Sequence, residues 1–430
     1  MSIKRYFKQA WGSLTKQPLL SAISVGGTAL AIFLIMIIFM IDEVKLAPFA
    51  PESNRDRWLV QVTASLGNKD WGSTPERNSS TGPMAYHTIR RTFYEMTTPE
   101  AVAAFTPFVG ESHLSVKGKT PFGAILRGTD DGFWKVMDFT FVSGHPYDKA
   151  SVEAGNQVAV LSESLARKLF DTSDCVGRDF MIDHVSYRVC GVVRDVSNLA
   201  SFAHADLWIP LTSNGIDKTT WSEYMGPLGA IILARDKSDF PKIREEYKEV
   251  WDKFEDEVKV GGWEFYRHQY PYDQFTYVNH KWRNTDPDMG AVKRHNLIVY
   301  TILLLIPAIN LSSLTQSRLS RRREEIGVRR SFGATSFSIM VDMFIENLII
   351  TLVAGLIGLL LSVAFIFLGG KSVLAPEGEV SGLRFDMIFN MSVFGTALFF
   401  CFLLNLLSAL IPSWQASRSK IVNALIGHNK

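Results

Sequence analysis

An arginine-rich stretch lies between two long apolar runs of this chain and limits what the chain can fold into. The apolar runs are Leu297–Leu314 and Phe344–Leu368, and between them stand Arg318, Arg321, Arg322, Arg323, Arg329 and Arg330. Because an arginine side chain is costly at the centre of a lipid bilayer, the cluster predicts a polar loop that joins two membrane spans. Its charge predicts a cytoplasmic loop, since basic residues concentrate on that side of a membrane.

Four apolar runs are each close to the ~20 residues that cross about 30 Å of hydrocarbon. They predict spans over residues 19–42, 296–317, 338–368 and 391–412. In the second span, Pro307 predicts a kink and not a break, because neighbouring helices can satisfy the freed carbonyl groups. Gly355 and Gly358 predict close packing of the third span against another helix, whereas Gly26 and Gly27 fit either such packing or a face toward lipid.

The pattern of residues 1–18 predicts a basic amphipathic arm ahead of the first span. This combination is similar to a secretory signal, but the apolar core exceeds the ~7–15 residues of a signal, so we expect a retained anchor. With four spans, the arm, the loop 318–337 and the tail 413–430 share one side, and their charge predicts that both termini are cytoplasmic. The net charge of +2 argues against a nucleic-acid partner.

The same four spans predict that the segment 43–293 and the short loop 369–390 lie outside the cytoplasm. The periodicity of the segment 43–293 predicts an α+β domain inserted between the first and second spans. The predicted strands are Gln157–Leu161, Phe180–Asp183, Tyr187–Val193, Asp206–Leu211 and Ala230–Ala234, and the predicted helices are Glu163–Phe170 and Phe240–Val258. Ser162 and Asp239 are the predicted N-caps of these two helices.

Two features of this domain leave alternatives open. The aromatic-rich segment Trp263–Trp282 fits a stacking surface for a ligand, a membrane-proximal aromatic belt or a strand packed on the core. Cys175 and Cys190 fit either a disulfide across a hairpin or two buried thiols, because sequence alone does not give the geometry of a disulfide.

No catalytic chemistry is predicted from the motifs. Gly118-Lys119-Thr120 and Gly370-Lys371-Ser372 are similar to phosphate-binding loops, but His113 and Phe365 stand where such a loop needs its first glycine. The histidines show no paired metal-ligand spacing, and no GxSxG segment occurs. We therefore expect no catalytic residue, cofactor or metal on this chain.

The arginine-rich loop itself has a helical pattern. Val328 and Phe332 share an apolar face, and Gly333 is placed to end the helix. Thr335 or Ser336 then caps the third span, whose Asp342 and Glu346 are expected to cap the helix or to pair with the arginines. From the pattern alone, docking to a partner protein and resting on lipid fit equally well.

The same loop resembles that of the MacB/FtsX-like permeases of the type VII ABC superfamily. The residues that match the family pattern are Asn310, Arg322, Glu325, Ile326, Gly327, Arg329, Gly333 and Ala334. GTDDGFWKVMDFTFVSGHPY, VAVLSESLARKLF and YRVCGVVRDV are similar to the family's periplasmic domain, and IPSWQASRSKIVNAL is close to its ending. Ser331 and Ile421 depart from the pattern, which more often has alanine and proline there.

This resemblance implies a non-enzymatic permease subunit in a bacterial inner membrane, with residues 43–293 periplasmic. It implies a second permease as partner, identical or different, and a separate cytoplasmic ATPase of the MacB or LolD kind that carries the ATP and Mg²⁺. It also allows a periplasmic adaptor. ATPase docking is expected at Glu325, Ile326, Gly327, Arg329, Arg330, Gly333 and Ala334. The implied function is mechanical transmission for efflux of a hydrophobic compound or peptide; the alternatives are an FtsX-like regulator of a cell-wall hydrolase and a lipoprotein-release permease.

Overall fold

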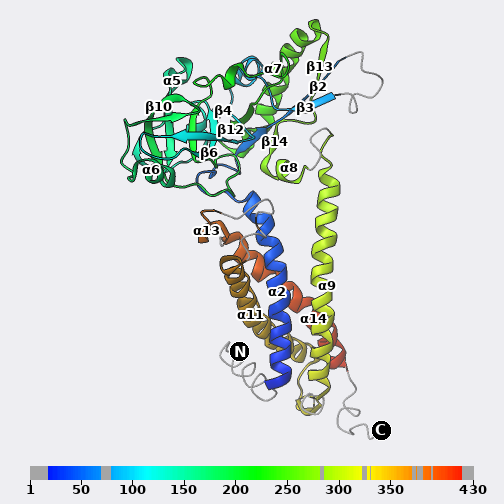
Figure 1. The fold of residues 1–430 in the computed structure, drawn as a ribbon. Helices are drawn as coiled ribbons and strands as arrows, with labels where there is room; N and C mark the ends of the chain where they lie inside the picture. Colours follow the sequence, from blue (N-terminus) through cyan, green and yellow to red (C-terminus); the bar gives the residue numbers. More distant parts are fainter. Residues whose placement is uncertain are drawn as a thin grey trace. The chain divides into compact units, whose positions relative to one another are not determined.

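The computed structural model describes residues 18–68, 79–280, 285–321, 327–329, 331–369, 374, 381–388 and 391–418 (Figure 1). It divides the chain into two compact units. The helical unit comprises Met1–Val44, Gly290–Glu379 and Arg384–Lys430, and the α+β unit comprises Lys45–Met289 and Val380–Leu383.

The helical unit is built on four long helices. They are α2 (Pro18–Leu46), α9 (Met289–Arg321), α11 (Ser336–Leu368) and α14 (Met391–Arg418), with the short α13 (Phe385–Ile388) before α14. Within the described residues, α2 over Val25–Leu46 and α11 over Phe337–Leu368 are long and apolar enough to cross a membrane, with mean hydropathies of 2.3 and 2.8. In α14, a shorter apolar segment covers Ser392–Leu407. Four crossings stay a prediction, although each predicted span lies within one of these helices. α9 continues through Pro307 without a break.

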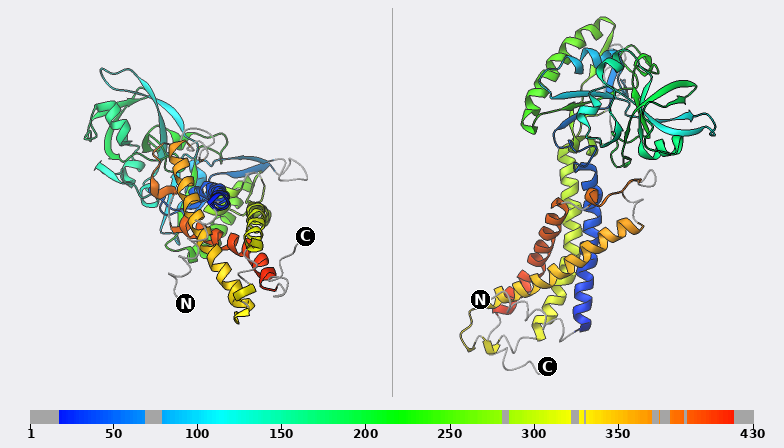
Figure 2. Two further views of the ribbon diagram at one scale, coloured as in Figure 1. Left: turned by 90° about the horizontal axis from the view of Figure 1, so that it is seen from below. Right: turned by 90° about the vertical axis from the view of Figure 1, so that its left-hand side faces the viewer.

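Glycines of α11 allow its close packing in the helical unit. A Cβ atom at Gly358 would lie 2.5 Å from the carbonyl oxygen of Ala29 in α2, and one at Gly355 would overlap the Cys401 sulfur of α14. These contacts confirm the predicted close approach at both glycines. A Cβ at Gly26 or Gly27 would meet no atom of the described residues within 4 Å, so neither glycine packs against another described helix of this chain. Figure 2 shows α11 running obliquely to α2.

The α+β unit contains most of the strands in one extended sheet. Its strands are β1 (Trp58–Gln61), β4 (Ala101–Phe105), β5 (Gly110–Ser115), β6 (Phe122–Thr129), β7 (Phe141–Gly144), β8 (Val158–Ser162), β9 (Asp179–Ile182), β10 (Val185–Val193), β11 (Leu207–Pro210), β12 (Gly229–Leu233) and β14 (Tyr272–Asp273). A second sheet has the order β13 (Trp263–Tyr266), β2 (Ala64–Asn68) and β3 (Ser79–Gly82). The helical elements are α3 (Tyr86–Arg91), η2 (Phe93–Glu95), α4 (Phe133–Val136), α5 (Lys149–Glu153), α6 (Glu163–Phe170), η3 (Ile216–Lys218), η4 (Lys237–Asp239), α7 (Phe240–Val260) and α8 (Gln274–Asn279).

One part of the large sheet closes on itself. The order β11-β8-β10-β9-β5-β6 returns to its start because β6 also pairs with β11, in parallel, with Leu126 opposite Leu207. The buried side chains of this ring pack with Leu165, Ala166 and Leu169 of α6 into one core. We call this part the ring lobe (at α6 and β10 in Figure 1).

The sheet continues from β6 through β4, β12, β1 and β14 into a second lobe with its own core. The apolar face of α7 fills it with Phe240, Ile243, Tyr247, Trp251, Phe254 and Val258. The aromatic segment contributes β13, whose Phe265 packs against Trp251 with ring centroids 5.1 Å apart. A strand packed on the core is therefore the correct interpretation of Trp263–Tyr266.

Most predicted elements of this unit are present within one or two residues. Ser162 caps α6 as predicted, since its hydroxyl accepts from the Leu165 N–H at 3.3 Å. Asp239 makes no cap bond: it ends the turn η4 in a helical backbone conformation, and its carboxylate lies 3.6 Å from Arg235 instead. Cys175 and Cys190 are free thiols, so the disulfide is wrong.

Candidate functional site

The turn that precedes α11 is the first candidate site. Gly333 has a φ of +89°, and the Ala334 N–H donates to the Arg329 carbonyl at 3.1 Å. This six-to-one bond around a left-handed glycine is a Schellman motif, which closes the C-terminus of a helix. The Thr335 hydroxyl then accepts from the Ser338 N–H and caps α11. The chain therefore ends one helix and starts the next within a few residues, as predicted for Gly333 and Thr335.

Large apolar side chains project from this turn. Phe332 is 88% exposed and Phe337 is 70% exposed, and Val328 is exposed beside them. Burying a phenylalanine side chain contributes about 1.5–3 kcal/mol, so outward phenylalanines on this turn fit either contact with lipid or contact with a partner protein. We call Val328, Phe332 and Phe337 the turn patch.

An ion pair ties the turn to α11. Arg329 Nη1 lies 3.8 Å from Asp342 Oδ2, which confirms the expected pairing of this acid with the arginine-rich loop. Glu346, one helical turn further on, is buried. The turn is thus linked to the second turn of α11.

Four of the predicted docking residues lie in this described turn: Gly327, Arg329, Gly333 and Ala334. Gly327 is buried, and Arg329 and Ala334 are partly exposed. Glu325, Ile326 and Arg330 lie outside the described residues. Docking itself stays a prediction for all seven residues.

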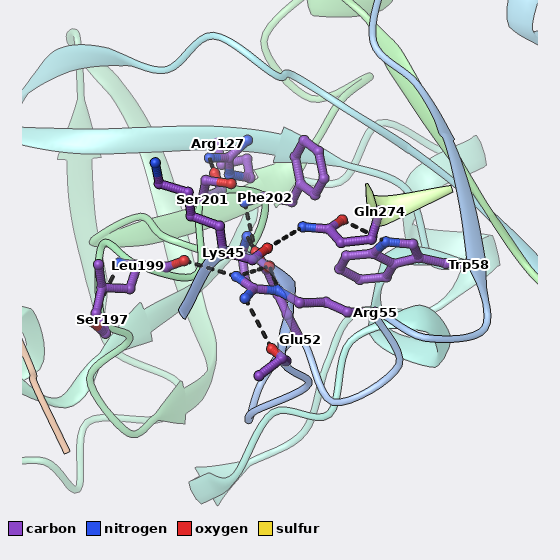
Figure 3. Close-up of polar contacts among 12 residues, drawn as sticks. Lys45, Glu52, Arg55, Trp58, Arg127, Ser197, Leu199, Ser201, Phe202 and Gln274 are labelled. Carbon is purple, nitrogen blue, oxygen red and sulfur yellow. Dashed lines mark hydrogen bonds and ion pairs between the residues drawn. The ribbon is translucent and has the colours of Figure 1, made fainter. Parts of the chain in front are cut away.

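The second candidate site lies at the start of the α+β unit, where the chain leaves α2 (Figure 3). Glu52 and Arg55 form an ion pair at 2.7 Å, and their side chains are 0% and 1% exposed. Arg55 also donates to the carbonyl oxygens of Ala47 at 3.1 Å and of Leu199 at 2.8 Å. The free oxygen of the Glu52 carboxylate accepts from the N–H groups of Phe202 and Ala203 at 2.7 and 2.9 Å.

These bonds hold residues 197–206, which we call the clasp loop. Arg127 reaches the loop from β6 and donates to the carbonyl oxygens of Ser201 and His204, each at 3.0 Å, and to that of Thr106. Burial lowers the pKa of the Arg127 guanidinium to about 10, and carbonyl oxygens are the groups that solvate its charge here. Buried cations on both sides therefore fix the backbone of the clasp loop.

The end of α2 is fastened separately to β1 and α8. The Gln274 amide donates to the Lys45 carbonyl at 2.8 Å, and its oxygen accepts from the Trp58 indole N–H at 2.9 Å. Lys45 lies in the last turn of α2, so this bond caps one of the carbonyl groups that a helix end leaves without a partner. The last residues of α2, which belong to the α+β unit from Lys45 onward, are thus bound through their backbone.

A further buried titratable group lies in the GTDDGF motif. Asp130 accepts from the Tyr94 hydroxyl at 2.7 Å and from the N–H groups of Ala104 and Phe133 at 2.8 and 3.0 Å. Burial raises the pKa of Asp130 to about 7, because desolvation outweighs these three hydrogen bonds. The role of this carboxyl group is to organise the backbone that follows β6.

Sequence reasoning did not find the buried network. A weak signal exists: Glu52 and Arg55 are charged residues of opposite sign, three apart, about ten residues after a long apolar run. Their partners lie about 150 residues away in sequence, which no local pattern reveals. Among the residues that the structure describes, no group of three or more His, Cys, Asp or Glu side chains is placed to hold a metal ion.

Known proteins are similar to this chain over most of its length. The family model of the MacB-like periplasmic core domain matches residues 21–250, and that of the FtsX-like permease C-terminal region matches residues 297–421. The ABC transporter permease YknZ of Bacillus subtilis is 23% identical over 310 residues, which are 70% of each chain. The macrolide export ATP-binding/permease protein MacB of Burkholderia cenocepacia is 22% identical over 436 residues, which cover 97% of this chain and 57% of that protein.

Solved structures of similar domains align with about half of this chain. The periplasmic region of MacB from Actinobacillus actinomycetemcomitans is 21% identical, covers 45% of this chain and 85% of that one, and aligns with a TM-score of 0.32. A domain of a permease protein from Porphyromonas gingivalis covers 50% of this chain and 88% of that one, at 16% identity and a TM-score of 0.37. The assignment therefore rests on the two family models, the first of which alone matches more than half of the sequence. The chain belongs to the MacB/FtsX-like family of ABC transporter permeases.

Proposed function

We propose that this chain is a permease subunit that passes movement from a separate cytoplasmic ATPase to its own α+β unit. The observation that carries the proposal is the turn patch, and above all Phe332, which is 88% exposed on a turn closed by Gly333. Aromatic and arginine side chains dominate the binding energy of protein interfaces, and Phe332 and Arg329 supply one of each.

A rigid, protruding turn favours a protein partner over lipid. Phe332 precedes the left-handed Gly333, and the ion pair between Arg329 and Asp342 fixes the turn against α11. A lipid surface gains nothing from such order, whereas a preformed shape lowers the entropic cost of docking to a protein. An ATPase with an apolar cleft and acidic rim fits this surface.

The proposed membrane arrangement has four crossings, by α2, α9, α11 and α14. The turn patch and both termini then face the cytoplasm of a bacterial inner membrane, and the α+β unit lies on the other side. A second permease copy, identical or different, completes the assembly, and the ATPase binds ATP and Mg²⁺. The cargo is a hydrophobic compound or peptide that is expelled from the outer side.

The buried network supports transmission in this arrangement. Gln274 binds the Lys45 carbonyl in the last turn of α2, and Arg55 binds the Ala47 carbonyl just after it. These two contacts hold the backbone where α2 ends. We expect movement of α2 to reach the α+β unit through them.

Purification of the full chain from its native membrane tests the docking. We expect an ABC-type ATPase, identified by mass spectrometry and by ATP hydrolysis, to co-purify with the wild type. Phe332→Asp should reduce its recovery at least about tenfold, because a charge in an apolar cleft stays unpaired. Val260→Asp is the matched control, since Val260 is 90% exposed in the α+β unit. Equal recovery with both variants contradicts the proposal.

Labelling of intact cells tests the sidedness. A membrane-impermeant maleimide should label Val260→Cys and leave Phe332→Cys unlabelled until the membrane is permeabilised. Labelling of Phe332→Cys in intact cells contradicts the cytoplasmic position of the turn.

A further inference from the structure

Residues 381–383, which lie between α11 and α14 in sequence, belong to the α+β unit and contact the clasp loop. The Ser197 hydroxyl donates to the Ser381 carbonyl at 2.7 Å, and the Ser381 N–H donates to the Asn198 side-chain oxygen at 3.1 Å. Gly382 follows with a φ of +61°, and a Cβ built on it would lie 3.6 Å from the Ser197 Cβ. The two backbones are therefore in direct contact over this short stretch.

The clasp loop thus holds two different segments of the chain, with unequal strength. It holds the segment after α2 through the buried Glu52–Arg55 pair. Losing one member of such a pair shifts a folding equilibrium by about 10²–10⁴-fold. It holds Ser381 through two neutral hydrogen bonds, each worth only about 2–10-fold, and Ser381 itself is exposed. When the same force acts on both contacts, the contact at Ser381 therefore opens before the one at the Glu52–Arg55 pair.

The clasp loop stays in place when that contact opens. Arg127 binds the Ser201 and His204 carbonyl groups, and Glu52 binds the Phe202 and Ala203 N–H groups, all without Ser381. Ser197 is 2% exposed, and its hydroxyl oxygen also accepts from the Leu199 N–H at 3.3 Å. The segment at Ser381 therefore separates from a surface that is already formed.

We propose that Ser197, Asn198 and Ser381 form a releasable latch, which is closed in the structure described and opens during the transport cycle. The inference rests on the proposed function and adds a point of regulation to it. Allosteric coupling typically changes an equilibrium by about 5–150-fold, which is the strength of two such hydrogen bonds. A strong joint at Arg55 and a releasable one at Ser381 let residues 381–383 separate from the clasp loop while the segment after α2 stays bound to it.

Amide hydrogen exchange of the purified full chain in nanodiscs tests whether the latch is closed at rest. In Asn198→Ala the Ser381 amide should exchange about 5–10-fold faster than in the wild type, because its acceptor is gone. Asn198→Asp keeps an acceptor and should restore slow exchange. Equal exchange rates in the wild type and Asn198→Ala overturn the latch.

A disulfide tests whether opening is needed. In Ser197→Cys/Gly382→Cys the Cβ separation of 3.6 Å falls within the range that a disulfide requires. We expect oxidation to lower ATP turnover by the complex with its ATPase at least about tenfold, and reduction to restore it. The reduced variant controls for strain at Gly382, and oxidised wild type controls for the three natural cysteines. Unchanged turnover after complete cross-linking overturns the releasable latch.

The two tests separate this inference from the proposed function. If no ATPase associates with the wild type, the proposed function fails and, with it, any role for the latch in coupling. The exchange measurement needs no ATPase, so it still decides whether the hydrogen-bonded latch exists.

Discussion

Gly358 of α11 lies against the backbone of Ala29 in α2, so closely that a Cβ atom at Gly358 would be 2.5 Å from the Ala29 carbonyl oxygen. A backbone oxygen cannot move aside as a flexible side chain can. Gly358→Ala should therefore destabilise the helical unit by about 1–3 kcal/mol, the usual cost of overpacking.

Gly26→Ala is the matched control for this prediction, since a Cβ there meets no atom within 4 Å and alanine favours helix. Labelling of the buried Cys401 thiol in mild denaturant measures opening of the helical unit. Labelling should be faster in Gly358→Ala and no faster than wild type in Gly26→Ala. Identical rates in both variants would show that α2 and α11 do not pack at Gly358.

Removal of Arg55 should destabilise the α+β unit strongly. In Arg55→Met, the Glu52 carboxylate stays buried without its cation, which typically costs about 3–5 kcal/mol. In Glu52→Gln/Arg55→Met neither charge of the pair remains, so the loss should be smaller than in Arg55→Met alone. Denaturant-dependent labelling of the buried Cys175 measures the free energy of unfolding.

Arg188→Met provides the comparison for a surface pair. Arg188 and Asp179 lie 2.9 Å apart, but their side chains are 65% and 54% exposed. Exposed pairs contribute at most about 1 kcal/mol. A loss in Arg55→Met no larger than that in Arg188→Met would contradict the importance of the buried pair.

The parts of the fold that sequence predicted are those with local signals. α6 and its cap follow from a serine ahead of an apolar repeat, and α7 from six core residues at helical spacing. Gly333 and Thr335 are also local signals, so the turn between α9 and α11 was predictable in outline. The predicted N-cap at Asp239 was wrong because the preceding turn, η4, already holds the Asp239 backbone in a helical conformation.

The parts that sequence did not predict depend on distant contacts. The ring closes only because β6 pairs with β11, which lies about 80 residues further along the chain. The residue pattern of neither strand indicates which strand it pairs with. The latch joins Ser197 to a residue 184 positions away. What Phe332 contacts was also not predictable from sequence, because an apolar residue on a short helix fits a lipid surface as well as a partner protein.

Gly333 should tolerate asparagine but not alanine. Its φ of +89° lies in the left-handed region, where a Cβ costs about 1–2 kcal/mol and asparagine is the best tolerated replacement. Gly333→Ala should therefore loosen the turn and speed exchange of the Ala334 amide, which donates to the Arg329 carbonyl, by about 5–30-fold. Gly333→Asn should show a smaller increase. Equal exchange in all three proteins would mean that the Schellman turn does not depend on glycine.

Asp130 should make the α+β unit less stable as pH rises from acid toward neutral. Its pKa is about 7 in the folded chain and near 3.8 when exposed, so between these values the folded state binds more protons than the unfolded state. The stability that this group contributes is thus fully present below about pH 4 and is lost as pH rises through 7, a change of about 4 kcal/mol.

Asp130→Asn has no titrating group at this position and should remove that part of the pH dependence. Its absolute stability should fall at acid pH, because an amide nitrogen cannot accept from the Tyr94 hydroxyl or from a backbone N–H as the second carboxyl oxygen does. The difference between wild type and variant should therefore shrink from pH 4 to pH 7, as measured by unfolding followed at Cys175. A constant difference over this range would show that Asp130 titrates at its ordinary value in the folded chain, and that the three hydrogen bonds to its carboxylate outweigh its burial.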